Sequence, residues 1–347
     1  MSNLESSRYQ KQILFAGIGK AGQAALAKAR VLVCGCGALG TVLVDTLARA
    51  GVGFIRIVDR DFVELSNLQR QVLFDEDDVA NRVPKAIAAR DRLQRINSEI
   101  EIEGIVADVN YTNIAEFAQD VDLILDGTDN FEVRFLINDH ALESGTPWIY
   151  TGCVGSHGQT MTILPGESAC LRCLIDTVPA PGATETCDTA GVLGPAINVI
   201  ASLEAVDALK LLSGQRDLIK PVLRVVDVWD ASVRNMNVAT LRETANCPAC
   251  VGGERTWLEG REGSQAAVLC GRNAVQISPS TKGDLSLADV ADRLRSSGAV
   301  TANAFLVRFQ LTDPDYDITI FQDGRAIVKG TEDVATARSL YSRFIGS

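Results

Sequence analysis

Three glycines spaced as G-x-G-x-x-G follow an apolar run near the start of the chain. They are Gly35, Gly37 and Gly40, in VLVCGCGALG, residues 31–40. This spacing permits a tight turn and a close approach to phosphate, and the start of the following helix offers N–H groups and a positive dipole end. Asp59 ends the next apolar run. At this position an acid can accept a hydrogen bond from a ribose hydroxyl. The pattern indicates a nucleotide site without distinguishing NAD from ATP.

Charged residues farther along the chain favour ATP. Arg70 closes Asn67-Leu-Gln-Arg, Lys85 follows Pro84, and Asp129 lies in Gly-Thr-Asp-Asn. A triphosphate needs cations at its β and γ phosphates and an acid to hold magnesium, whereas a nicotinamide site needs neither. Taken singly, residues such as Arg70 and Lys85 are more often solvated surface charges. Their combination with Asp129 predicts ATP and magnesium.

Two C-x-x-C pairs, Cys170 with Cys173 and Cys247 with Cys250, suit a metal. Each pair offers two thiolates, and together they complete the tetrahedral sulfur site that zinc prefers. The pairs are too far apart for a zinc finger, so the predicted zinc staples two distant segments of one domain. A redox C-x-x-C or two unrelated pairs are the alternatives.

Alternating strands and helices must position these residues. We expect a doubly wound α/β fold with a mostly parallel sheet and the nucleotide at the carboxyl ends of its strands. An N-terminal helical segment covers residues 8–29. The expected strands are 31–34, 54–58, 100–105, 122–125, 148–151, 159–164 and 223–228, and the expected helices are 39–50, 84–97 and 196–212.

The composition changes after Cys250, where several glycines follow. We expect an adenylation domain over 1–252, a linker over 253–263 and a small α+β domain of unknown role over 264–347, in the order β-α-β-β-β-α. Asp323-Gly324 is a hairpin turn signal within it.

Bulk properties restrict the partners and the location. The 347 residues carry a net charge of −11, which argues against nucleic acid or an anionic membrane as the main partner. The sequence has neither a signal-peptide pattern nor an apolar run long enough to span a membrane. The nine cysteines do not suggest a secreted disulfide framework, so we expect a cytoplasmic protein.

GCGALG, NLQRQ, Pro84-Lys85 and GTDN, in this order, resemble the sulfur-carrier adenylyltransferases of the ThiF/MoeB family over about residues 8–252. These enzymes of thiamine and molybdenum-cofactor biosynthesis are bacterial relatives of ubiquitin-activating enzymes. The resemblance implies a homodimer with a structural zinc. It also implies that ATP adenylates the C-terminal glycine of a ubiquitin-like sulfur carrier ending in Gly-Gly, with release of pyrophosphate.

The resemblance also implies residue roles. Asp59 would hold the ribose, Asp129 would hold magnesium and be needed for adenylation, and the phosphates would be held by Asn67, Arg70 and Lys85. Lys11, in RYQKQ, replaces a family arginine that reaches the partner subunit's ATP. Lysine keeps the charge but loses the bidentate fork.

Cys187 stands alone in TCDTAGV. The family places a cysteine at this point of its crossover loop, where ThiF-like members bond it covalently to the activated carrier and MoeB-like members do not need it. An incidental exposed cysteine and a nucleophile for an acyl group or sulfur both remain open.

Sulfur transfer for the thiazole of thiamine is the expected purpose, because TCDTAGV is present and a rhodanese domain is not. The alternative within the same chemistry is activation of the molybdopterin synthase small subunit. Another alternative is an NAD-dependent oxidoreductase, but its nucleotide site would not require Arg70, Lys85 or Asp129. A non-catalytic carrier-docking module would have no need of them.

Overall fold

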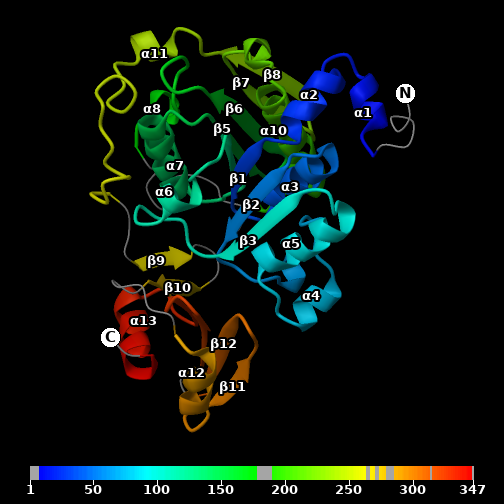
Figure 1. Ribbon diagram of the computed structural model, residues 1–347. Coiled ribbons are helices and arrows are strands. Elements are labelled where there is room, and N and C mark those ends of the chain that lie inside the picture. Colours follow the sequence, from blue (N-terminus) through cyan, green and yellow to red (C-terminus); the bar gives the residue numbers. More distant parts are fainter. Residues whose placement is uncertain are drawn as a thin grey trace. The chain divides into compact units, whose positions relative to one another are not determined.

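The computed structural model describes residues 8–177, 190–262, 266–269, 273–278, 285–312 and 315–345. The chain divides into two compact units, Met1–Glu262 and Gly263–Ser347. Each unit contains its own sheet and its own hydrophobic core (Figure 1).

The first unit is built on an eight-stranded sheet in the order β3-β2-β1-β4-β5-β6-β7-β8. The first five strands in this order, β3-β2-β1-β4-β5, pair in parallel. Strands β6, β7 and β8 continue the sheet, each antiparallel to the strand before it. The central strands are continuous apolar runs because helices cover both faces. The strands are β1 (Arg30–Cys34), β2 (Phe54–Asp59), β3 (Glu101–Val106), β4 (Leu123–Asp126), β5 (Trp148–Val154), β6 (His157–Ile163), β7 (Val222–Asp227) and β8 (Ser232–Asn237).

Helices α3, α5 and α10 pack together on one face of this sheet, and α6, α7 and α8 lie on the other (Figure 1). The predicted doubly wound α/β fold is confirmed. Within the described residues, no helix has the length and apolarity that crossing a membrane requires. The helices are α1 (Gln10–Leu14), α2 (Gly19–Leu26), α3 (Ala38–Ala50), η1 (Leu65–Asn67), α4 (Glu76–Ala80), α5 (Lys85–Ile96), α6 (Ile114–Phe117), α7 (Phe131–Ser144), α8 (Leu171–Leu174), α10 (Gly194–Leu212), η2 (Arg216–Leu218) and α11 (Leu241–Thr244).

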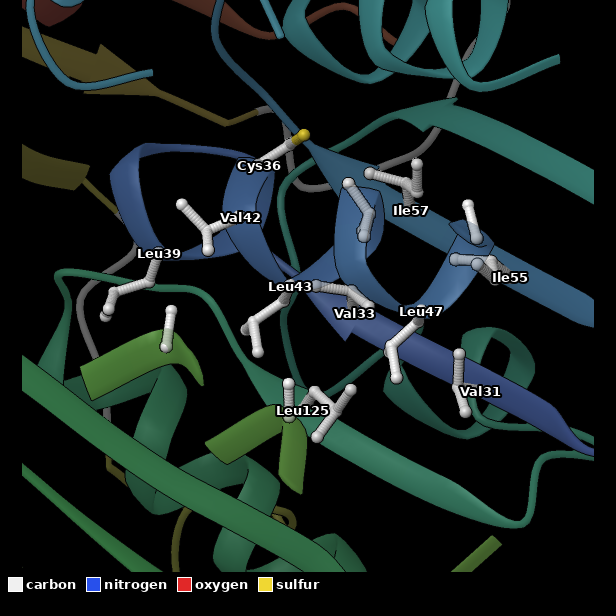
Figure 2. Close-up of a cluster of buried hydrophobic side chains, with 14 of the residues drawn as sticks. Val31, Val33, Cys36, Leu39, Val42, Leu43, Leu47, Ile55, Ile57 and Leu125 are labelled. Atoms are coloured by element: carbon white, nitrogen blue, oxygen red, sulfur yellow. The ribbon is translucent and has the colours of Figure 1, made fainter. Parts of the chain in front are cut away.

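Helix α3 connects the glycine loop to the core. Leu39, Leu43 and Leu47 recur every four residues along one stripe of the helix, and Figure 2 shows them among the side chains of β1, β2 and β4. The helix ends at Gly51, whose φ of 81° is the left-handed conformation that glycine adopts without a steric penalty. Packing along the whole helix fixes its first turn next to the loop.

The second unit is a six-stranded antiparallel sheet in the order β11-β12-β13-β14-β10-β9, with two helices. The expected α+β class is confirmed, but the order is β-β-α-β-β-β-β-α. Residues 266–278 contain two strands of a hairpin instead of one, and β11 is a short, mostly exposed edge strand that the pattern did not predict. The elements are β9 (Ala266–Leu269), β10 (Ala274–Ile277), α12 (Leu287–Leu294), β11 (Ala299–Ala302), β12 (Leu306–Thr312), β13 (Asp315–Phe321), β14 (Ala326–Lys329) and α13 (Val334–Phe344).

The segment 253–263, expected to be a linker, belongs to the first unit up to Glu262. The ring of Trp257 lies 5.5 Å from that of Phe135. The backbone N–H groups of Trp257 and Leu258 donate to Asp139 Oδ2 on α7, at 3.0 and 3.5 Å. The buried side chains of Phe135 and Asp139 therefore hold Trp257 and Leu258 in place. The glycine content alone had assigned these two residues to a linker.

Candidate functional site

The glycine loop joins β1 to α3 at the carboxyl ends of the parallel strands. A Cβ atom on Gly40 would lie 2.1 Å from Gly35 O, and one on Gly127 would lie 2.3 Å from the same oxygen. Any side chain at either position would displace backbone. The loop after β1 and the turn after β4 therefore approach each other at a distance that only glycine permits, and Gly127 belongs to the site although the glycine motif does not include it.

Gly37 has a different environment. Among the residues that the structure describes, the nearest atom to a Cβ there would be Gln71 Nε2, at 3.9 Å. These residues therefore leave space for a ligand beside Gly37. Gln71 is 3% exposed, and its Oε1 has no hydrogen-bond partner within the described part of the chain. The first-turn N–H groups of α3 begin directly after Gly37, and such groups bind phosphate.

Asp59 is fixed at the end of β2. Its Oδ2 accepts the N–H of Cys36 from the glycine loop at 2.6 Å, and its Oδ1 accepts the N–H of Asp61 at 2.7 Å. Burial raises the pKa of Asp59, and the charge of Lys85 opposes that rise. The Asp59 carboxylate is thus held against the glycine loop. If the loop carried the phosphates of a nucleotide, the ribose would lie beside this carboxylate.

Lys85 begins α5 and is brought to the same place. Its side chain is 4% exposed, and Nζ lies 3.3 Å from Asp61 Oδ2. Arg60 lies beside it, with Nη1 3.0 Å from Asp108 Oδ1. The sequence reasoning did not single out Arg60, Asp61 or Asp108, although Arg60 and Asp61 directly follow the predicted acid.

Asn67 and Arg70 come from the η1 turn. Asn67 is buried, and its Oδ1 accepts the N–H of Glu64 at 3.0 Å. The half-buried Arg70 donates from Nη1 to Ser66 O at 2.9 Å. A Cβ on Gly194, which begins α10, would be 4.0 Å from Arg70 Cβ, so this turn lies at the N-terminus of α10.

A buried ion pair holds the Gly-Thr-Asp-Asn turn. Asp126 is fully buried; its Oδ2 accepts Arg134 Nε at 2.8 Å, and its Oδ1 accepts the N–H of Thr128 at 2.9 Å. Asp129 itself is exposed at the tip of this turn. Sequence reasoning missed Arg134 because nothing local connects it to Asp126.

Lys11 does not reach the glycine loop of its own chain. Helix α1 is tied to the far end of α3, where Gln12 Nε2 donates to Ala50 O at 2.8 Å. The 13 residues of α3 separate that end from the loop by about 20 Å. Cys187 lies outside the described residues.

The four cysteines of the two C-x-x-C pairs come together beside α7, and their sulfurs all lie within 4.8 Å of one another. Cys170 Sγ is 3.6 Å from Cys247 Sγ, and Cys173 Sγ is 3.4 Å from Cys250 Sγ. A tetrahedral zinc with bonds of about 2.3 Å places its sulfurs about 3.8 Å apart. The cluster therefore matches the size of a zinc site without rearrangement of the chain.

Two thiols of this cluster, Cys247 and Cys250, have lowered pKa values. Hydrogen bonding from Cys170 lowers the pKa of Cys247 to about 5 and that of Cys250 to about 7. Hydrogen bonding to Cys173 and Cys247 raises the pKa of Cys170 instead. Metal ligation requires thiolates, so the donor set suits a metal, and all four cysteines are free of disulfides.

Comparison with known proteins agrees with this geometry. A family model described as the ThiF family matches residues 9–249. The chain therefore belongs to the ThiF family, and the predicted resemblance is confirmed. The structure of Escherichia coli MccB with ATP has a similar fold, with a TM-score of 0.61 and 25% identity over 73% of this chain and 76% of that chain.

Two relatives differ in how much of the chain they match. The sulfur carrier protein ThiS adenylyltransferase of Bacillus subtilis (strain 168) is 45% identical over 342 residues, which are 98% of this chain and 100% of the relative. The protein of the same name from E. coli (strain K12) is 36% identical over 253 residues, which are 73% of this chain and 98% of the relative. The E. coli relative is therefore about as long as the first unit alone.

Proposed function

We propose that this protein uses ATP to adenylate the C-terminal glycine of a ubiquitin-like sulfur carrier ending in Gly-Gly, for the thiazole of thiamine. The observation that carries the proposal is the 45% identity to a ThiS adenylyltransferase over 98% of this chain. The assembled edge, with an open Gly37, Asp59 and Lys85, agrees with it.

The nucleotide would lie across the carboxyl ends of β1, β2 and β4. The N-terminus of α3 and Lys85 would hold the phosphates, with Asn67 and Arg70 closing over them, and Asp59 would hold the ribose. The contact between Asp59 and the N–H of Cys36 supports this assignment, because it joins the ribose acid to the phosphate loop.

In the reaction, a terminal carboxylate oxygen of the carrier would attack the α-phosphorus. The bond from that phosphorus to the bridging oxygen would break, and pyrophosphate would leave with the electron pair. Fixed cations beside the leaving group stabilise the charge that develops there. Asp129 would hold the magnesium that neutralises the same charge, and its exposed place at the turn tip leaves it accessible to a hydrated ion.

A structural zinc would be held by Cys170, Cys173, Cys247 and Cys250. The short distances between their sulfurs and the lowered pKa values of Cys247 and Cys250 support this assignment. A cytoplasmic location belongs to the same proposal, since free thiols persist where thiols are kept reduced.

A homodimer is the proposed assembly. Lys11 lies far from its own glycine loop, so it would act only on the nucleotide of a second copy. Leu14 and Phe15, next to Lys11, are large apolar side chains that are 70% and 65% exposed. A second copy would cover them.

ATP–pyrophosphate exchange tests the proposal. We expect exchange to require a carrier with an intact terminal glycine, and to be faster with a ThiS-type carrier than with a molybdopterin synthase small subunit. Preference for the latter would change the pathway and keep the reaction. ATP binding without exchange on any carrier would favour a docking module, and NAD binding without ATP binding would favour an oxidoreductase.

A further inference from the structure

The side chain of Arg60 lies within a ring of acids at the carboxyl edge of the sheet. Its Nη1 is 3.0 Å from Asp108 Oδ1, and its Nε is 3.9 Å from Asp61 Oδ1. The side chain is 19% exposed. Burial by itself would lower the pKa of Arg60, but the charges of Asp108, Asp61 and Asp129 together raise it. A permanently charged, planar group is thus held in one place.

The position of Arg60 follows from the strand order. Going outward from the glycine loop, the sheet runs β1, β2, β3. Asp59 ends β2, and Arg60 reaches from the next position to Asp108, which follows β3. Arg60 therefore joins the carboxyl ends of β2 and β3, which come after β1 and its glycine loop in the order of the strands.

A nucleotide has its ribose between its phosphates and its base. If the phosphates occupy the glycine loop and Asp59 holds the ribose, the base must extend toward the ends of β2 and β3. The acids around Arg60 disfavour a phosphate there, whereas an uncharged purine carries no such penalty. A guanidinium plane stacks readily on an aromatic ring.

We propose that Arg60 is the residue that binds the purine ring of ATP, with its guanidinium plane against the ring and Asp108 holding that plane in position. The proposal rests on the proposed function, since it assumes that ATP is the nucleotide. Asp108 is positioned by its own loop, because Asn113, which is 3% exposed, donates from Nδ2 to Asp108 O at 2.8 Å.

Substitution of Arg60 should weaken binding of the base and not of the phosphates. In titration calorimetry with magnesium present, Arg60→Ala should lower ATP affinity roughly 10-fold. It should leave the affinity for tripolyphosphate, which has no base, unchanged. In the exchange assay the KM for ATP should rise while the maximal rate stays the same, because binding lost equally from ground and transition states affects KM alone.

Two further variants separate stacking from charge and from stability. Arg60→Lys keeps the charge and loses the plane, so it should show most of the same loss. Arg56→Ala removes a half-buried arginine within β2, the strand that Arg60 follows. Arg56 is paired with Glu103 at 2.6 Å, and its loss should leave ATP affinity unchanged. Thermal melting of all three variants would reveal any unfolding.

Three results would overturn the proposal: equal weakening of ATP and tripolyphosphate by Arg60→Ala, no weakening of either, or full affinity in Arg60→Lys. Failure of the unsubstituted protein to bind ATP would remove the proposed function, and this inference with it. An intact ATP affinity in Arg60→Ala would remove the inference alone.

Discussion

The proposed nucleotide edge, at the carboxyl ends of β1, β2 and β4, and the four-cysteine cluster lie in the same unit but differ in how complete they are. The sulfurs of the cluster already lie within 4.8 Å of one another, in a largely buried place beside α7. At the nucleotide edge Asp59 and Lys85 are fixed and buried, whereas Asp129 is exposed and Lys11 is remote. Four ligands already close together, as in the cysteine cluster, suit a structural metal site. A site with some side chains still exposed, as at the nucleotide edge, suits a substrate that must enter and leave.

This difference predicts two kinds of failure on mutation. Substitutions at the nucleotide edge should reduce activity and leave the fold intact. Substitutions in the cluster should first reduce stability, with activity lost as a consequence.

The largest effect on activity is expected from Asp129→Ala. Loss of a magnesium ligand should lower the exchange rate by about 1000-fold or more, since the ion stabilises the leaving pyrophosphate. The melting temperature should stay the same because Asp129 is exposed. Glu116→Ala, also at an exposed acid, serves as the control. Substantial exchange in Asp129→Ala would exclude this residue from the mechanism.

Cys170→Ser should have the largest effect on stability. We expect loss of bound zinc, measured by elemental analysis, and a fall of several degrees in melting temperature, because a structural metal contributes directly to folding. The matched variant is Cys153→Ser, at a buried cysteine outside the cluster, which should keep its zinc. Full zinc content in Cys170→Ser would contradict the assignment.

The two kinds of failure should also be separable within the glycine loop. Gly40→Ala places a Cβ 2.1 Å from Gly35 O and should lower both the melting temperature and ATP affinity. The new Cβ in Gly37→Ala comes no closer than 3.9 Å to the other described residues. This variant should therefore weaken ATP binding while the melting temperature stays within about 2 °C. Equal destabilisation by both would mean that Gly37 is not open.

The smallest effect is expected from ending the chain at Glu262. The E. coli relative is about as long as the first unit, and the second unit has its own core. The shortened protein should keep its exchange rate within about threefold, under the same carrier and ATP concentrations. A loss beyond tenfold would give the second unit a direct part in catalysis or carrier binding.

Sequence patterns predicted the elements whose residues are adjacent in the chain. The apolar run, glycines and acid of residues 31–59 specify strand, turn, helix and strand, and the structure contains each of them. Edge strands such as β8 and β11 were not predicted, because their mostly exposed residues lack the apolar pattern that marks a buried strand.

By itself, the sequence determined the fold class, the glycine loop and the two cysteine pairs, because local spacing encodes each of them. Only the tertiary structure brought Gly127 against Gly35, paired Asp126 with Arg134 and held Arg60 with Asp108. Two of these contacts join residues that follow different strands. The third joins the end of β4 to helix α7. Their geometry depends on strand order and register, which single-segment patterns do not specify.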